Sequence, residues 1–203
     1  MTVRVETIPI WWQRGKTETR FEPLRGILVG AAAGGIYLIA LAALENVTLA
    51  VLLGMATLLT ATKASYEVGL RRFLGEAGDV TVLVGLLIKL QCLLMLPVEL
   101  VPSALIGNQA FSRYAISSLQ TISRNSLIIM TILGVAPLVL IGNVAFLLLT
   151  PFLWLARNMF VGWLVRTKGG FNDHSLAALQ QVIEVLFYLF VILSLHLTQK
   201  FAW

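Results

Sequence analysis

Chemically reactive side chains are scarce in this chain. Its 203 residues include two aspartates, two histidines and a single cysteine, and only 12% of the residues are charged. The lone Cys92 excludes a disulfide within the chain and a metal site made of several cysteines. Local spacing gives no Ser-His-Asp set, no zinc signature and no phosphate-binding glycine loop followed by Lys-Ser or Lys-Thr. Few kinds of catalytic site can therefore be assembled from these residues.

Hydrophobic sequence takes the place of the missing polar residues. It makes up 58% of the chain and gives a mean hydropathy of +0.87. This composition is typical of an integral membrane protein and not of a soluble domain. The net charge of +5 does not indicate nucleic acid, because the basic residues lie mostly in short connections between apolar runs. We therefore expect the lipid bilayer as a partner, with basic residues contacting its headgroups, and no nucleic acid.

The apolar runs predict an all-α fold, a polytopic membrane helix bundle with about seven transmembrane helices. Each span needs about 20 mostly apolar residues. Polar or turn-rich points divide the chain into runs at 24–44, 47–65, 79–97, 102–121, 125–141, 143–165 and 174–198. The division between the fifth and sixth runs rests on Pro137 and Gly142-Asn143, and without it there are six spans. Residues 24–203 are predicted to form a single transmembrane domain.

Basic residues fall in alternate connections, which predicts the orientation of the chain. Lys or Arg residues precede the first span and lie in or beside the second, fourth and sixth connections, whereas the first, third and fifth contain none. This pattern places the amino terminus in the cytoplasm and the carboxyl terminus on the far side. Residues 1–23, with Trp11-Trp12 among basic residues, are predicted to lie along the headgroups as an interfacial segment, and a contact with a partner protein is the alternative.

Four charged residues lie well inside the predicted spans, away from their ends. They are Lys89, Arg113, Arg157 and Glu184. A charge at this depth costs about 2.5 kcal/mol or more, so each needs a counter-charge, a water-filled cavity or a route to the interface. We predict that Glu184 pairs with Arg113 or Lys89. Gln180 adds a polar stripe beside Glu184, which fits either a ligand held near the cytoplasmic surface or a hydrogen-bonded seam between helices.

Two groups of glycines have different predicted roles. Gly169-Gly170 precedes Asn172 and Asp173, either of which would cap a following helix, and the free amides beyond would favour an anion such as phosphate. An ordinary capped connection between helices is the alternative. The glycines of the first span, at positions 30, 34 and 35, have no strand before them, so we expect close helix packing and no nucleotide-binding fingerprint.

One segment, residues 166–187, resembles a known family. It reads Arg-Thr-Lys-Gly-Gly-Phe-Asn-Asp-His-Ser-Leu-Ala-Ala-Leu-Gln-Gln-Val-Ile-Glu-Val-Leu-Phe. This is similar to the carboxyl-terminal motif of cobalamin synthase, the adenosylcobinamide-GDP ribazoletransferase family, which runs approximately Gly-Gly-x-Thr-Gly-Asp-x-Leu-Gly-Ala-x-x-Glu-x-x-Glu before an apolar helix. Shorter pieces occur in the family's order: Phe21 with Arg25-Gly26-Ile27, Leu58-Leu59-Thr60, Leu86-Leu87-Ile88-Lys89 and Ser112-Arg113. The similarity covers most of the chain, but only 166–187 is specific.

The resemblance implies an inner-membrane enzyme that joins GDP-activated cobinamide to α-ribazole or its phosphate with Mg²⁺. The family holds the metal mainly with an Asp-rich loop after the second span, because Mg²⁺ prefers oxygen ligands. Here the corresponding loop, 60–79, is shorter and lacks the aspartate cluster. Asp173-His174 stands in place of the family's Gly-Asp pair, and Gln181 in place of its first glutamate. Only Glu184 is an acid at its matching position.

Three functions follow from this combination. The first is a cobalamin-synthase-like protein that has lost catalysis and serves as a structural or assembly subunit of a larger membrane complex, and the missing acids favour it. The second is a Mg²⁺-dependent ribazoletransferase with an atypical site made of Glu67, Glu76, Asp79, Asp173, His174 and Glu184. Candidate anion-binding residues for that site are Arg71, Arg72, Lys89, Arg113, Gly169 and Gly170. The third is a small transporter or lipid-binding protein that uses the charged groups within the spans.

Overall fold

The computed structural model describes residues 21–120, 124–139, 145–168, 170 and 172–201. Within these residues the chain forms eight α-helices and two short 3-10 turns, and no strand. The helices are α1 Glu22–Leu44, α2 Val47–Ala61, α3 Ser65–Leu74, α4 Gly78–Met95, α5 Val101–Gln120, α6 Arg124–Val139, α7 Ala145–Lys168 and α8 Asp173–Phe201. The turns are η3 Gly75–Ala77 and η4 Val98–Leu100. The predicted all-α fold is therefore confirmed. Residues 1–20 of the predicted interfacial segment and Gly169 lie outside the described residues.

Each predicted apolar run coincides with one helix. Among the described residues, three stretches are long and apolar enough to cross a membrane: α1, the stretch Ser65–Met95 that contains α3 and α4, and Asp173–Thr198 of α8. The apolar helices Val47–Ala61 and Leu127–Pro137 are shorter than a usual span. The chain is thus a helical protein with several helices suited to a membrane, and the number of seven spans stays a prediction.

The polar loop expected between the second and third runs contains a helix, α3. It begins after two residues in the left-handed conformation, Lys63 and Ala64, and ends at Gly75 with φ 63°. Gly69 and Leu70 on one face are buried, and a Cβ at Gly69 would lie only 2.2 Å from Ala177 Cβ in α8. Glycine therefore lets α3 approach α8 closely, and this approach brings Glu67 to Gln181 of α8.

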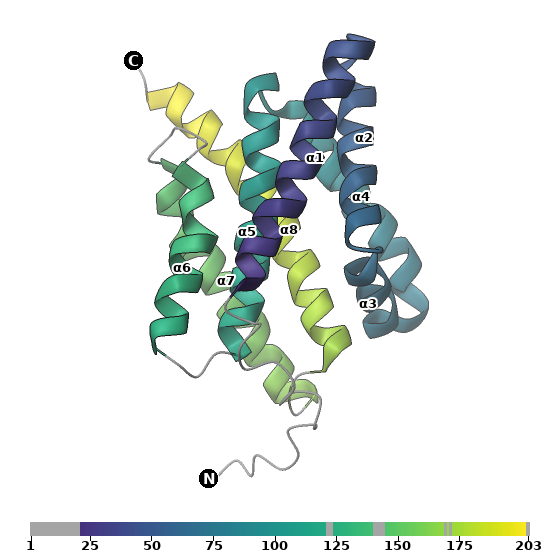
Figure 1. Cartoon of the computed structure of the whole chain (residues 1–203). Coiled ribbons are helices and arrows are strands. Elements are labelled where there is room, and N and C mark those ends of the chain that lie inside the picture. The colour runs from purple at the N-terminus through teal and green to yellow at the C-terminus, as the bar shows by residue number, and fades with distance from the viewer. Residues whose placement is uncertain (1–20, 121–123, 140–144, 169, 171, 202–203) are drawn as a thin grey trace.

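The helices pack along one another around α5 and α8 (Figure 1). α1 lies beside α5, and a Cβ at Gly30 would meet the backbone of Ile106 at 2.6 Å. The predicted packing role is confirmed for Gly30 and fits Gly34, which faces Pro102 at 3.3 Å, whereas Gly35 faces nothing within 4 Å. The start of α1 and the end of α8 lie at opposite ends of the bundle (Figure 1).

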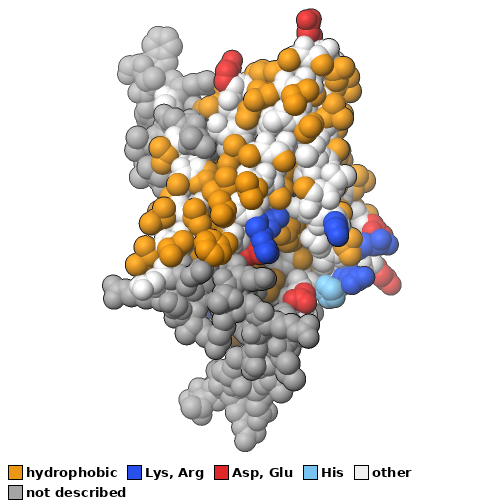
Figure 2. All heavy atoms as spheres, viewed as in Figure 1, with side chains coloured by type: hydrophobic (Ala, Val, Ile, Leu, Met, Phe, Trp, Pro, Cys, Tyr) orange, Lys and Arg blue, Asp and Glu red, His pale blue; other side chains and the backbone are white. Residues whose placement is uncertain are grey.

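Apolar side chains cover much of the outer surface. Figure 2 shows a broad hydrophobic area above a lower region in which the Lys and Arg side chains of this face gather. The most exposed examples come from several helices, including Ile39 on α1, Val80 on α4 and Met159 on α7. An apolar surface with charged side chains at its border suits contact with hydrocarbon and headgroups.

Candidate functional site

The start of α8 fixes the segment with the family resemblance. Asn172 caps the helix: its Oδ1 accepts a hydrogen bond from the Ser175 backbone N–H at 2.7 Å, and the Ser175 hydroxyl accepts one from the Asn172 N–H at 2.8 Å. Gly170 has φ 152°, a conformation that side chains rarely adopt. The predicted cap is confirmed at Asn172, and it sets the direction in which the polar face of α8 enters the bundle.

Glu184 on α8 pairs with Lys89 on α4. The Lys89 Nζ lies 2.5 Å from Glu184 Oε2, and both residues are buried, with 5% and 3% of their surface exposed. The prediction that Glu184 meets Lys89 or Arg113 is confirmed for Lys89. A buried charge without a partner would be strongly unfavourable, and each residue supplies the counter-charge of the other.

Three glutamines complete the surroundings of this ion pair. Gln180 Nε2 and Gln109 Nε2 donate to Glu184 Oε1 at 3.0 and 3.3 Å. Gln181 accepts a hydrogen bond from Lys89 Nζ at 2.5 Å and donates one from Nε2 to Glu67 Oε1 at 2.9 Å. These bonds join α3, α4, α5 and α8 through one connected polar network. The polar stripe of α8 is thus a seam between helices at this point.

Arg113 takes a different partner. Its Nη1 donates to Glu22 Oε2 at 3.3 Å, so α5 is tied to the first turn of α1. The guanidinium also lies over the Tyr66 ring, 5.6 Å from its centroid. Arg113 therefore reaches the edge of the polar network through Tyr66 but does not pair with Glu184.

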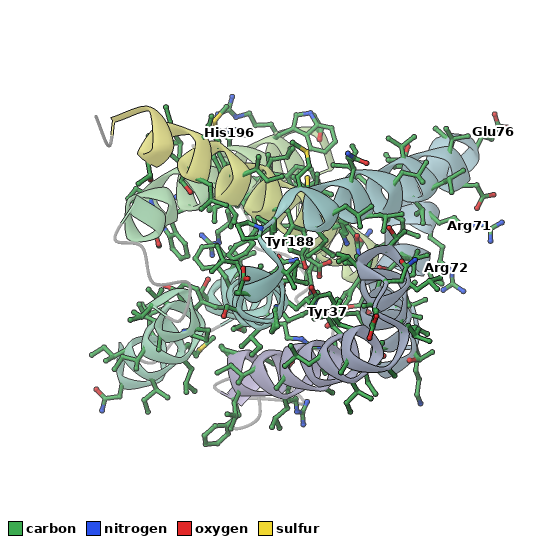
Figure 3. The ribbon with its side chains drawn as sticks, turned by 90° about the horizontal axis from the view of Figure 1, so that it is seen from above. Tyr37, Arg71, Arg72, Glu76, Tyr188 and His196 are labelled. Atoms are coloured by element: carbon green, nitrogen blue, oxygen red, sulfur yellow. The ribbon has the colours of Figure 1, made fainter. Side chains whose placement is uncertain are left out.

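The other candidate acids lie apart from Glu184. Asp79 is exposed and pairs with Arg71, with Nε and Oδ1 2.7 Å apart. Glu76 and Asp173 are exposed as well, and His174 is half-buried. Figure 3 shows Arg71, Arg72 and Glu76 projecting from the outer edge of the bundle, away from Tyr188 in its interior. Of the five acids and one histidine proposed for an enzymatic site, the structure brings only Glu67 and Glu184 into the same polar network.

These residues do not fit a Mg²⁺ ion. Magnesium takes oxygen ligands in an octahedral arrangement and is usually held by carboxylates. Glu67 and Glu184 are linked through Lys89 and Gln181, so a cation already occupies the space beside Glu184. Within the ranges that the structure describes, no three His, Cys, Asp or Glu side chains are grouped closely enough to hold a metal ion. The donor set here is that of a polar helix contact and not of a divalent metal site.

A small pocket lies beside the ion pair. It encloses a cavity of about 20 Å³ and is lined by residues of five helices, among them Glu67, Lys89, Gln109, Glu184 and Tyr188. Several buried polar atoms there make no hydrogen bond: Glu67 Oε2, Gln109 Oε1 and Tyr188 Oη. The Asn108 side chain, which lies close to the Tyr188 hydroxyl, makes no hydrogen bond either.

Sequence reasoning did not identify Gln109, Tyr188 or Tyr66 as part of this site. A signal was present in the polar pair Asn108-Gln109, which interrupts an otherwise apolar stretch of α5. A polar amide inside a predicted span usually faces another helix and not lipid. That rule would have directed Gln109 inward, although it could not have named Glu184 as its partner.

Comparison of the chain with protein-family models, with curated proteins and with solved structures found no match. The resemblance of residues 166–187 to cobalamin synthase therefore stays a prediction from the sequence. The geometry of the site does not depend on this resemblance. Glu184 of the capped helix α8 is bonded to a lysine and two glutamines, and it lies beside a small pocket with unpartnered oxygens.

Proposed function

We propose that this chain is a cobalamin-synthase-like membrane protein that has lost catalysis and serves as a structural or assembly subunit of a larger membrane complex. The ion pair between Lys89 and Glu184 carries the proposal. Glu184 is the one acid retained at its place in the family-like motif, and its two carboxylate oxygens are already bonded to Lys89, Gln109 and Gln180. Its role in this arrangement is to hold helices together.

The neighbouring position supports the same conclusion. Gln181 stands where the family motif has a glutamate, and its amide connects Lys89 on α4 to Glu67 on α3. An amide can donate to one residue and accept from another, whereas a carboxylate only accepts. The replacement of an acid by an amide thus suits a seam between helices and removes a metal ligand.

The length of the apolar helices supports an assembled state. α2 contains 15 residues, which corresponds to about 22 Å of helix, whereas the hydrocarbon core is about 30 Å thick. Helices shorter than the bilayer are accommodated by thinning the bilayer or by oligomerising. Leu52 and Leu53 on α2 are also exposed. We propose that the complex lies in a bacterial-type inner membrane, with the amino terminus of the chain in the cytoplasm and the carboxyl terminus on the far side.

The first experiment measures transferase activity. The purified chain is incubated with GDP-cobinamide, α-ribazole and Mg²⁺, and a competent cobalamin synthase serves as positive control. We expect no turnover and no binding of GDP-cobinamide. Turnover that depends on Mg²⁺ and is lost in Glu184→Gln would instead establish a ribazoletransferase. One observation favours that alternative, because Glu67 and Glu184 line the same pocket.

The second experiment tests the subunit role. The chain is extracted in mild detergent, and the proteins retained with it are quantified after two different purification steps. We expect the same partner at a fixed ratio in both, and a loss of that partner in Leu52→Ala/Leu53→Ala. Leu28→Ala on α1, also an exposed leucine, is the matched control and should retain the partner. Recovery of the chain as a lone monomer contradicts the proposal.

A further inference from the structure

The pocket beside Lys89 and Glu184 is lined by polar and by apolar side chains. The polar ones include Glu67, Gln109 and Tyr188. The apolar ones include half-buried residues of two helices: Met55, Leu58 and Leu59 of α2, and Leu86 of α4. If these helices cross the bilayer, a ligand with an apolar part can enter between α2 and α4.

Three oxygens in this pocket lack a hydrogen-bond partner. They are Glu67 Oε2, Gln109 Oε1 and Tyr188 Oη, all with almost no accessible surface. Gln109 and Tyr188 are 2% and 1% exposed, so bulk water does not reach them in this structure. Buried polar atoms are nearly always satisfied in native proteins, and leaving one without a partner is unfavourable. Each of these oxygens can accept a hydrogen bond, so a partner that donates hydrogen bonds would satisfy them.

The charges in the pocket define that partner further. Two carboxylates, Glu67 and Glu184, face one ammonium, Lys89, so the lining residues carry a formal charge of −1. Arg113 does not supply the missing positive charge, because it pairs with Glu22. An additional cation would balance the excess carboxylate. The cavity of about 20 Å³ has room for a group about the size of one water molecule.

We propose that this pocket binds a primary ammonium group attached to an apolar chain, which enters from the bilayer between α2 and α4. A primary ammonium carries a positive charge and three N–H donors without an acceptor. These donors match the three oxygens of Glu67, Gln109 and Tyr188. The attached chain lies against the lining leucines of α2 and α4. The proposal depends on the pocket alone and stands whether or not the chain is a subunit of a complex.

The experiment compares three ligands of equal chain length on the purified full chain in nonionic detergent. The probes are octylamine, octyltrimethylammonium and octanol, and binding is followed by titration and by the shift in Tm. Octylamine should bind best, because the trimethylated amine is charged but donates no hydrogen bond, and the alcohol has one donor and no charge. Equal binding of octylamine and octyltrimethylammonium overturns the proposal, as does the same Tm shift with Na⁺ alone.

Two variants locate the binding. Glu67→Gln keeps the shape of the side chain but removes its charge, and it should weaken octylamine binding roughly ten- to a hundredfold, since hydrogen bonds to charged groups contribute about 1.5–3 kcal/mol. Glu76→Gln is the matched control: Glu76 belongs to η3, is exposed and does not line the pocket. An equal effect of the two variants contradicts the assignment.

A final comparison identifies the source of the ammonium group. The chain is transferred to nanodiscs of phosphatidylethanolamine or phosphatidylcholine with identical acyl chains, and the retained lipids are identified by native mass spectrometry. Retention of phosphatidylethanolamine that Glu67→Gln removes shows that a lipid headgroup supplies the ammonium. Octylamine binding without such retention shows that a free amine does. Absence of both overturns the proposal.

Discussion

Lys89 on α4 and Glu184 on α8 form an ion pair of 2.5 Å between side chains that are 7% and 5% exposed. The two residues are 95 positions apart in the sequence. A buried ion pair does not by itself make a protein more stable than an apolar pair would, but breaking it leaves a charge in the interior. The pair therefore makes the relative placement of α4 and α8 specific.

The first prediction follows from this pair. Lys89→Met and Glu184→Leu should each lower the free energy of unfolding by about 3–5 kcal/mol, because each leaves the other charge buried and unpaired. The double variant should lose less than the sum of the two single losses. Unfolding by SDS in mixed micelles measures all four proteins in a double-mutant cycle.

The exposed pair Arg71 and Asp79 is the control for that cycle. Its side chains are 61% and 67% exposed, so solvent screens them and the pair contributes at most about 1 kcal/mol. Arg71→Met should therefore change stability far less than Lys89→Met. Similar losses in the two variants, or additive losses in the cycle, contradict the assigned role of Glu184.

The second prediction concerns the contact between α1 and α5. A Cβ at Gly30 would lie 2.6 Å from Ile106 Cα and 2.8 Å from Leu105 O, which are backbone atoms that cannot move independently. Gly30→Ala should separate the helices and lower the free energy of unfolding by about 1–3 kcal/mol. Gly35 on the same helix has nothing within 4 Å, so Gly35→Ala should be neutral or slightly stabilising. Equal effects in the same SDS titration contradict this packing.

The helices could be predicted because long apolar runs are separated by polar or turn-forming residues. The same reasoning missed α3. Its buried face includes only Gly69 and Leu70, and the neighbouring charged residues, such as Arg71 and Arg72, make the segment resemble a polar loop. Helix α3 matters for the site, because it brings Glu67 to Gln181 at 2.9 Å. A short amphipathic helix is stabilised by its tertiary contacts more than by its own sequence.

The partner of Glu184 could be narrowed to two residues for a simple reason. A buried acid needs a cation, and few cations fall inside the predicted spans. The sequence did not distinguish Lys89 from Arg113, because the choice depends on Glu22 binding Arg113 across 91 residues. Gln109 was missed for the same reason: its bond to Glu184 joins helices 75 residues apart. Contacts between residues so far apart in the sequence depend on how each helix is oriented about its own axis in the bundle.

The third prediction concerns Arg157, a buried cation of α7. Its Nε donates to Ala115 O at 2.8 Å, its Nη2 to Ser118 Oγ at 3.0 Å, and its guanidinium lies 4.1 Å from the centroid of the Trp154 ring. Lysine keeps the charge but lacks the planar fork that makes these contacts together. Arg157→Lys should therefore lower the free energy of unfolding by about 1–3 kcal/mol.

Arg166, near the end of the same helix, is the matched control for Arg157. It is exposed, so Arg166→Lys should change the free energy of unfolding by less than about 0.5 kcal/mol. The measurement is SDS titration of the two variants under identical detergent conditions. A loss at Arg166 equal to that at Arg157 would show that the buried contacts of Arg157 do not contribute specifically.

The last prediction restores an acid at position 181. Gln181→Glu replaces the donor to Glu67 with an acceptor, so it should destabilise the protein, and Mg²⁺ should not correct this while Lys89 stays bonded to Glu184. In Gln181→Glu/Lys89→Met the acids face one another without a cation, and a divalent ion becomes a suitable partner. Mg²⁺ well above its Kd should then add about 1 kcal/mol or more and raise Tm by about 2–4 °C. Gln181→Met/Lys89→Met should show no such increase. An equal Mg²⁺ effect on the unmodified chain would contradict this assignment. It would mean that the natural carboxylates already bind the metal although Lys89 is bonded to Glu184.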